Sequence, residues 1–260
     1  MKDNPFHSKV PVKEVPVLSY PNSGSSLLAG VLHQLGINMG SRLKSPQSVN
    51  PAGLFEDEDF TEILSKIWFR YNIRCDYSRI IHLEKLLETA EIYQNKLSMI
   101  IRQKQQQNID WGVKEPRLSL LWPAFSDILQ NPHWIVSERD VNRLVKSRHN
   151  KINQRFRLFR ARNIEYYIKN GHFFTILSYL TNSIRFLGIT ENALKAVIDH
   201  YYGLIYDFVR DKNCLIINYD NLLSNPQTEI QRITRFLSIN PRPAQYEAAL
   251  KLIAPGLKHF

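Results

Sequence analysis

The chain alternates short apolar runs with segments in which apolar residues recur at helical spacing, and this alternation restricts the fold more than any other feature. The predicted strands are residues 15–20, 108–113, 133–138 and 214–219. Helices are predicted over 83–107, 192–210 and 226–237. Of three further predicted helices, one begins at 27, one ends at 67 and one begins at 140. Because apolar strands separated by helices imply a sheet buried on both faces, we expect an α/β fold of three layers with a central, mainly parallel sheet.

Length and charge limit the class of protein. A chain of 260 residues with 43% hydrophobic content predicts one globular domain over residues 1–260. Lys and Arg total 34 against 24 Asp and Glu, and the net charge of +10 favours polyanionic partners. Phosphorylated cofactors, nucleic acid and acidic membrane surfaces all satisfy this charge.

Membrane and metal signals are weak in the sequence. No apolar run approaches the roughly 18 residues of a membrane span, and residues 1–12 lack the apolar core of a signal peptide. Cys75 and Cys214 stand far apart without metal-ligand spacing. We therefore expect a cytoplasmic protein without a membrane span or a metal requirement, and the sequence does not fix its oligomeric state.

Polar clusters directly follow three of the predicted strands. They are the turn at 21–26, the corner at 114–117, and Arg139 with Asp140. In an open parallel sheet, ligands bind beyond the carboxyl ends of the strands, so function is expected at these positions.

The turn at 21–26 predicts an anion site. Gly24 allows close approach of the backbone, and Ser23, Ser25 and Ser26 bring hydroxyls and amides to a helix N-terminus. The lysine of the nucleotide-triphosphate loop is missing, which disfavours a triphosphate. The alternative is an ordinary helix capped by serine after a turn.

A second anion site is predicted after the third strand. On a helix beginning near residue 140, Ser147 and Lys151 share a face, so they and Arg139 can close on one phosphate. The alternative is a solvated basic helix, because other cations lie on the same segment: Arg143, Lys146 and Arg148.

Together these residues resemble the PAPS-dependent sulfotransferases, which use 3′-phosphoadenosine 5′-phosphosulfate. Residues 21–26 resemble the family's 5′-phosphosulfate loop, Pro-Arg/Lys-Ser-Gly-Thr-Ser/Thr, and Arg139 with Ser147 matches its 3′-phosphate motif in residue type and spacing. Further segments resemble bacterial members in the same order: 50–57, 111–117, 219–223 and 236–237. The resemblance covers nearly the whole chain and implies a P-loop-like sulfotransferase domain.

The resemblance implies transfer of a sulfuryl group from PAPS to an acceptor hydroxyl of a sugar, lipid alcohol or small metabolite, with 3′,5′-adenosine bisphosphate as product. The implied cofactor-binding residues are Asn22, Ser23, Gly24, Ser25, Ser26, Arg139, Ser147 and, more weakly, Lys151. The corner at 114–116 is similar to the Lys-Asp-Pro corner of tyrosylprotein sulfotransferases, which implies that Lys114 stabilises the transferring group.

Asn22 departs from the family pattern, in which a cation at this position neutralises the leaving phosphate. Charge-assisted hydrogen bonds are roughly twice as strong as neutral ones, so stabilisation of the transition state is weaker unless Lys114 compensates. The alternative function is a non-catalytic phosphonucleotide-binding protein of the same fold. A nucleic-acid binder is a third hypothesis, supported by charge and the basic run at 151–162, but no recognition motif accompanies that run.

Transfer also requires a base that accepts the hydroxyl proton. Many relatives use a Glu or His near the acceptor pocket, and no His follows the Lys114 corner here. This leaves Glu56 or Asp57, with Glu115 second. The other interpretation of the acidic run at 56–59 is favourable charge at a helix N-terminus.

Overall fold

Four parallel strands form the centre of the molecule. The computed structural model describes residues 11–45, 53–71, 79–150 and 190–253. Its strands lie in the order β2-β1-β3-β4. They are β1 (Glu14–Ser19), β2 (Trp111–Lys114), β3 (Trp134–Glu138) and β4 (Cys214–Asn218). The predicted parallel sheet is confirmed, and β1 lies inside it rather than at an edge.

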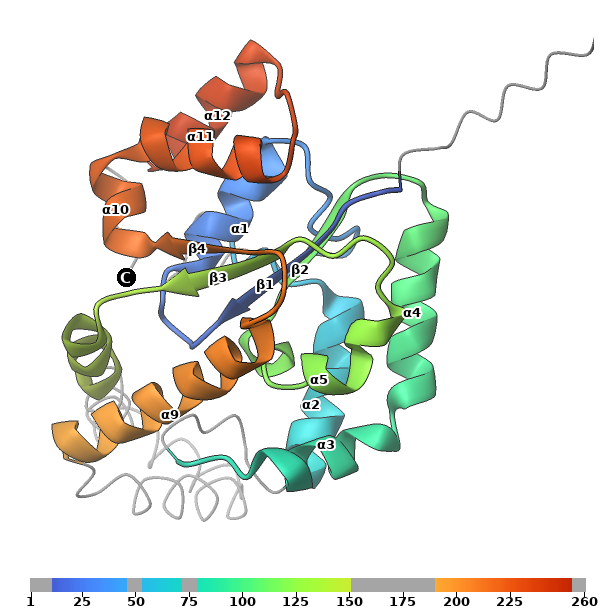
Figure 1. Cartoon of the computed structure of the whole chain (residues 1–260), viewed down its shortest axis with the longest axis vertical. Coiled ribbons are helices and arrows are strands. Elements are labelled where there is room, and N and C mark those ends of the chain that lie inside the picture. Colours follow the sequence, from blue (N-terminus) through green and yellow to red (C-terminus); the bar gives the residue numbers. More distant parts are fainter. Residues whose placement is uncertain (1–10, 46–52, 72–78, 151–189, 254–260) are drawn as a thin grey trace, which may run out of the picture.

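Helices cover both faces of the sheet, as Figure 1 shows. One face is covered by α1 (Ser25–Gln34), α10 (Tyr219–Ser224), α11 (Pro226–Phe236) and α12 (Pro243–Ile253). The other is covered by α2 (Glu58–Arg70), α3 (Leu83–Glu91), α4 (Gln94–Gln106), α5 (Trp122–Phe125) and α9 (Glu191–Val209). The three-layer α/β fold expected from the sequence is therefore present.

Alternate side chains of each inner strand enter opposite layers. Val17 of β1 packs in the core beneath α1, whereas the next residue, Leu18, packs in the core beneath α9. Ile135 and Val136 of β3 divide in the same way. Since both faces of a strand are buried, its sequence becomes a continuous apolar run, which is why these strands were predictable.

The register places the carboxyl ends of the strands at one edge. Val17 pairs with Lys114 on one side and with Ile135 on the other, and Glu138 pairs with Asn218. The segments that leave the four strands therefore start close together, on the side of the sheet where the arrowheads point in Figure 1.

The helix predicted over 83–107 is instead two helices, α3 and α4. The chain departs from helical geometry at Tyr93, with φ −105° and ψ 4°. The break allows Leu86 of α3 and Leu97 of α4 to reach the same core while Ile92, at the corner, is 60% exposed. Neither Gly nor Pro marks this corner, so packing rather than local propensity determines it.

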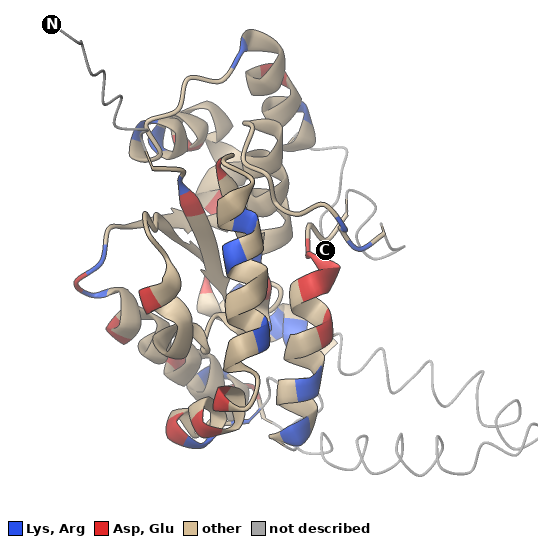
Figure 2. Ribbon diagram, turned by 90° about the vertical axis from the view of Figure 1, so that its right-hand side faces the viewer, with Lys and Arg blue, Asp and Glu red and all other residues tan. Residues whose placement is uncertain are grey.

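Helix α2 begins with acidic residues and ends with a basic one. Glu58 and Asp59 lie in its first turn and Arg70 in its last, and Figure 2 shows this separation of charge along the helix. The helix dipole favours this order. The expectation of acidic charge at a helix N-terminus near residues 56–59 is thus confirmed for α2.

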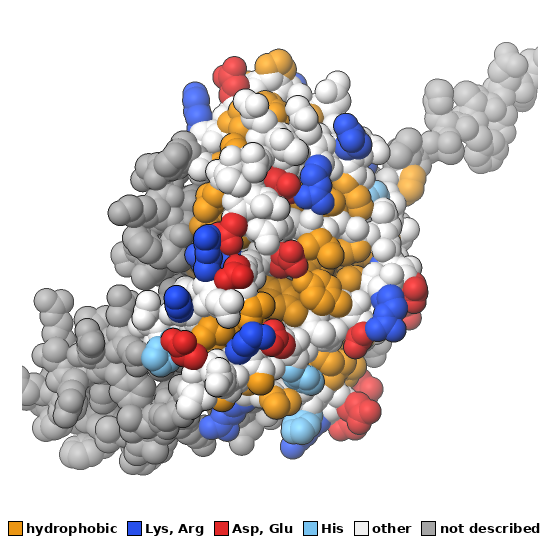
Figure 3. All heavy atoms as spheres, turned by 60° about the vertical axis from the view of Figure 1, so that its left-hand side comes forward, with side chains coloured by type: hydrophobic (Ala, Val, Ile, Leu, Met, Phe, Trp, Pro, Cys, Tyr) orange, Lys and Arg blue, Asp and Glu red, His pale blue; other side chains and the backbone are white. Residues whose placement is uncertain are grey.

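Strand β4 forms one edge of the sheet. Ile216 is 41% exposed, and Figure 3 shows apolar side chains gathered on the side of the molecule that this edge faces. Arg232 of α11 donates a hydrogen bond through Nη2 to the carbonyl of Ile216 at 3.2 Å. One open backbone group of the edge is thereby covered by a charged side chain.

Across the described ranges, no helix combines the length and the apolar character needed to cross a membrane.

Candidate functional site

Polar groups from all four strands meet at the carboxyl edge of the sheet. A loop at 20–24 joins β1 to α1, Lys114 ends β2, Arg139 follows β3, and Tyr219 follows β4. The sequence identified three of these four positions. Direct contacts connect the loop at 20–24 and the start of α1 with the other three positions.

The loop at 20–24 turns sharply to present the start of α1. Asn22 and Gly24 have φ values of 70° and 88°, both in the left-handed region. The amide of Ser23 donates to the carbonyl of Tyr20 at 3.2 Å, and no side chain of the described residues caps α1. Since the first amides of a helix have no partner within it, this uncapped end favours an anion.

Arg139 and Tyr219 close one side of the loop. Nη1 of Arg139 donates to the carbonyl of Asn22 at 3.5 Å, and its guanidinium carbon lies 4.8 Å from the centroid of the Tyr219 ring. Burial raises the pKa of Tyr219, and the charge of Arg139 opposes that shift. The buried Nε of Arg139 has no hydrogen-bond partner in the part of the chain that the structure describes. An anionic oxygen of a ligand would satisfy this buried donor.

Lys114 closes the other side. Its side chain is 1% exposed, and its Nζ lies 3.3 Å from Oγ of Ser26 and 2.8 Å from Oε1 of Glu56. The lysine therefore joins the first turn of α1 to the acidic segment before α2. In this buried position its charge is weakly screened by water.

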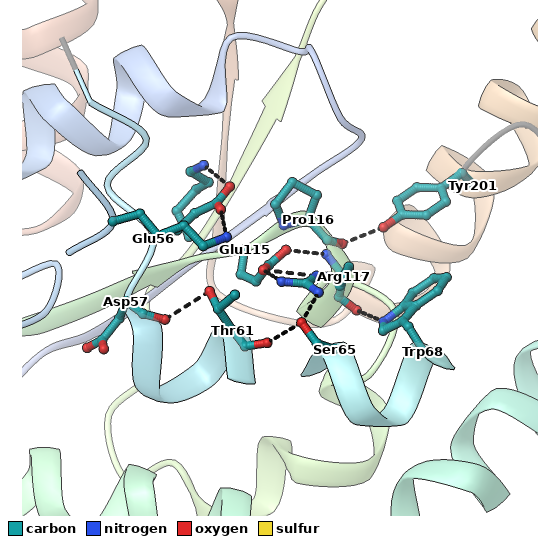
Figure 4. A network of polar contacts seen from close by, with 11 residues as sticks. Glu56, Asp57, Thr61, Ser65, Trp68, Glu115, Pro116, Arg117 and Tyr201 are labelled. Carbon is teal, nitrogen blue, oxygen red and sulfur yellow. Dashed lines mark hydrogen bonds and ion pairs between the residues drawn. The ribbon is translucent and has the colours of Figure 1, made fainter. Parts of the chain in front are cut away.

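Glu56 is held between two lysines. Its Oε2 accepts a hydrogen bond from Nζ of Lys44 at 2.7 Å, and Figure 4 shows both contacts of the carboxylate. Burial raises the pKa of Glu56, but Lys114 and Lys44 together outweigh burial and lower it below the ordinary value. Glu56 is thus ionised at neutral pH.

Asp57 faces a different partner. It caps α2 by accepting a hydrogen bond from the amide of Asp59 at 3.1 Å, and its Oδ2 binds Nζ of Lys104 on α4 at 2.5 Å. Both side chains of this ion pair are buried. The structure thus places the Asp57 carboxylate in a helix cap and an interhelical ion pair rather than beside Lys114.

Glu115 also forms a buried ion pair, with Arg117. Its carboxylate accepts hydrogen bonds from the Nε of Arg117 at 3.0 Å and from Nη2 of the same guanidinium. Arg117 in turn donates to Oγ of Ser65 on α2 at 2.7 Å, and Trp68 and Tyr201 bind backbone carbonyls of this corner, as Figure 4 shows. This network fixes the backbone that carries Lys114.

The structure thus brings together the turn at 22–26, Glu56, Lys114 and Arg139. Ser147 lies half-buried on the helix at 141–150, and among the described residues no hydrogen bond joins it to Arg139. Lys151 and the basic run at 151–162 lie outside the described residues.

Two residues of the site were not singled out from the sequence. Tyr219 was predicted as the last residue of the strand at 214–219, whereas β4 ends at Asn218, so the rule that selected Arg139 points to Tyr219 only once the end of the strand is known. Lys44 has no such signal, because it lies outside the strand ends and reaches the site through Glu56.

Comparison of the sequence with protein families and with curated proteins finds no match. Among solved structures, the fold is similar to the sulfotransferase domain of the Synechococcus olefin synthase, with a TM-score of 0.50 and 14% identity over 90% of this chain and 76% of that one. It is also similar to a sulfotransferase of Mycobacterium tuberculosis, with a TM-score of 0.50 and 11% identity over 94% of this chain and 72% of that one. The chain therefore has the fold of sulfotransferase domains.

Proposed function

We propose that the protein is a sulfotransferase that transfers a sulfuryl group from PAPS to an acceptor hydroxyl. The observation that carries this proposal is the direct contact of buried Lys114 with Ser26 in the uncapped start of α1, with Arg139 on the other side of the same loop. The fold, shared with sulfotransferase domains, supports the same assignment.

The residues present fit the two phosphate ends of PAPS. The amides and hydroxyls of residues 23–26 would hold the 5′-phosphosulfate, and Arg139, with Ser147 and Lys151, would hold the 3′-phosphate. The buried Nε of Arg139 offers a donor that an anionic oxygen would satisfy. When bound, PAPS supplies an activated sulfuryl group and a bisphosphate leaving group.

Lys114 is positioned to stabilise charge. A cation in a water-poor site stabilises developing negative charge more than it stabilises a ground state. Glu56, ionised beside it, is the proposed base that accepts the proton of the acceptor hydroxyl. Asp57 and Glu115 are weaker candidates, since their carboxylates are engaged in buried ion pairs.

The proposal is tested by incubating the protein with PAPS and a panel of sugars, lipid alcohols and small hydroxylated metabolites. Sulfated product is measured by mass spectrometry. Removing one such stabilising group costs roughly a hundredfold or more in turnover, so Lys114→Ala should lose transfer to that extent. Lys195→Ala, which breaks an exposed pair on α9, is the matched control.

Two outcomes contradict the proposal. Tight PAPS binding by the wild type without transfer to any acceptor would show a phosphonucleotide-binding protein of the same fold. Absence of PAPS binding would remove the cofactor assignment altogether.

A further inference from the structure

We propose that Lys44 is a second cationic residue of the transfer site, positioned by Glu56 to supply a charge that the loop at 20–24 does not carry. This inference rests on the proposed function. It begins from the carboxylate of Glu56, which joins two ammonium groups: Nζ of Lys114 at 2.8 Å and Nζ of Lys44 at 2.7 Å.

The two lysines differ in their access to solvent. The side chain of Lys114 is 1% exposed, whereas that of Lys44 is 26% exposed. Lys114 is therefore enclosed beneath the site, and Lys44 is the member of the trio that an incoming ligand can reach.

The backbone fixes Lys44 in this place. Leu43 forms an antiparallel bridge with Asp57, and the amide of Lys44 donates to the carbonyl of Glu56 at 2.9 Å. The amide of Glu58 donates to the carbonyl of Arg42 at 2.8 Å on the other side of the bridge. Main-chain pairing thus positions the lysine beside Glu56 before its side chain makes any contact.

The charges of the trio explain why two lysines are needed. Glu56 is ionised, so it neutralises one of them. Lys114 and Glu56 alone form a neutral pair, whereas addition of Lys44 leaves one net positive charge on the trio, whose Lys114 contacts Ser26. An anionic sulfuryl donor held by the start of α1 and by Arg139 is attracted more strongly to the charged trio than to a neutral pair.

The conformation of the loop gives a reason for placing this charge outside it. Asn22 has a φ of 70°, in the left-handed region, which asparagine adopts more readily than lysine or arginine. A neutral residue that suits the turn leaves the loop without a cation. Lys44 supplies that cation from a different segment.

Lys44→Met tests the inference, because it keeps the apolar stem and the backbone contacts while it removes the charge. We expect turnover to fall at least tenfold, and Lys44→Arg to retain most of it. The matched control is Arg42→Met, which removes a cation from the same segment. Arg42 forms ion pairs on the exposed side of α2 with Glu58, Asp59 and Glu62. Its substitution should therefore leave turnover unchanged.

Two further readouts separate this role from a structural one. Asn22→Lys should restore part of the turnover of Lys44→Met, because it returns a cation to the loop. Lys44 and Lys114 are the charged groups that contact Glu56 within the described residues. Loss of Lys44 removes one cause of the lowered pKa of Glu56, so the acid limb of the pH profile should move to higher pH.

Failure of the inference is distinct from failure of the proposed function. If Lys44→Met, or Lys44→Gln should the Met variant not fold, turns over like the wild type, Lys44 has no role and sulfuryl transfer still stands. If the wild type forms no sulfated product, the proposed function fails and this inference fails with it.

Discussion

The ring of Tyr219 occupies the space that a side chain at residue 24 would require. A Cβ placed on Gly24 would lie 1.9 Å from Cδ2 of Tyr219, and the φ of Gly24 is 88°. Gly24→Ala should therefore displace the ring and strain the turn. We expect a lower melting temperature and at least tenfold weaker binding of 3′,5′-adenosine bisphosphate in calorimetry.

Gly203 provides the matched control. It lies within α9, and a Cβ placed there meets no atom of the described residues within 4 Å. Because glycine costs a helix interior about 0.5 to 1 kcal/mol relative to alanine, Gly203→Ala should raise the free energy of unfolding and leave binding unchanged. If Gly24→Ala binds the bisphosphate as tightly as the wild type, the loop does not form the cofactor site.

Arg139→Ala tests the 3′-phosphate assignment. A hydrogen bond to a charged group contributes roughly 1.5 to 3 kcal/mol, so bisphosphate binding should weaken at least tenfold in calorimetry. Adenosine 5′-monophosphate, which lacks the 3′ group, should bind weakly and respond little to the substitution. Arg210→Ala at the exposed end of α9 is the control, and equal losses in both variants would remove the assignment.

Glu56→Gln tests the base. The substitution keeps the size of the side chain and removes the proton acceptor, so turnover should fall about a hundredfold or more. Bisphosphate affinity should change little. A variant Glu56→Gln with full turnover, beside an inactive Asp57→Asn or Glu115→Gln that remains folded, would move the role to the inactive residue.

The lowered pKa of Glu56 sets the pH dependence. A carboxylate with a depressed pKa in the folded state stabilises the fold above its unfolded pKa, about 4.3, and loses that contribution as the pH falls through the folded value. The acid limb of kcat/KM reports the pKa of the base in the free enzyme, so with Glu56 as base it should lie below about pH 4.3 in the wild type. A limb near pH 6 would point to a group other than Glu56.

Removing the partner of Asp57 should cost stability. Lys104 and Asp57 are both buried, and loss of one member of such a pair typically costs about 3 to 5 kcal/mol. Lys104→Met should therefore lower the free energy of unfolding by that order in urea titrations. Lys195→Met breaks an exposed pair with Asp199 and should cost no more than about 0.5 kcal/mol. Equal effects would show that the Lys104 pair is not buried in solution.

The sheet was predictable because each strand is a short apolar run, buried in β1, β2 and β3 and partly exposed in the edge strand β4, and because polar residues mark the carboxyl ends. Lys114 and Arg139 were identified by this rule. The separation of Glu56 from Asp57 was not predictable, since adjacent carboxylates look alike in sequence and only the positions of Lys44 and Lys104 distinguish them. The corner at Tyr93 likewise depends on packing between distant segments.

The contact between Gly24 and Tyr219 has a consequence for synthesis of the protein. The loop at 20–24 leaves the ribosome before β4 and Tyr219, which follow nearly two hundred residues later. A nascent chain that stops before β4 contains the loop at 20–24 but lacks the Tyr219 ring that packs on it. It also lacks β4, the strand that pairs with β3. Ligand at a hundred times its Kd stabilises a protein by about 2.7 kcal/mol, so the proposed cofactor should protect chains that contain β4 from proteolysis and leave chains that stop before it exposed.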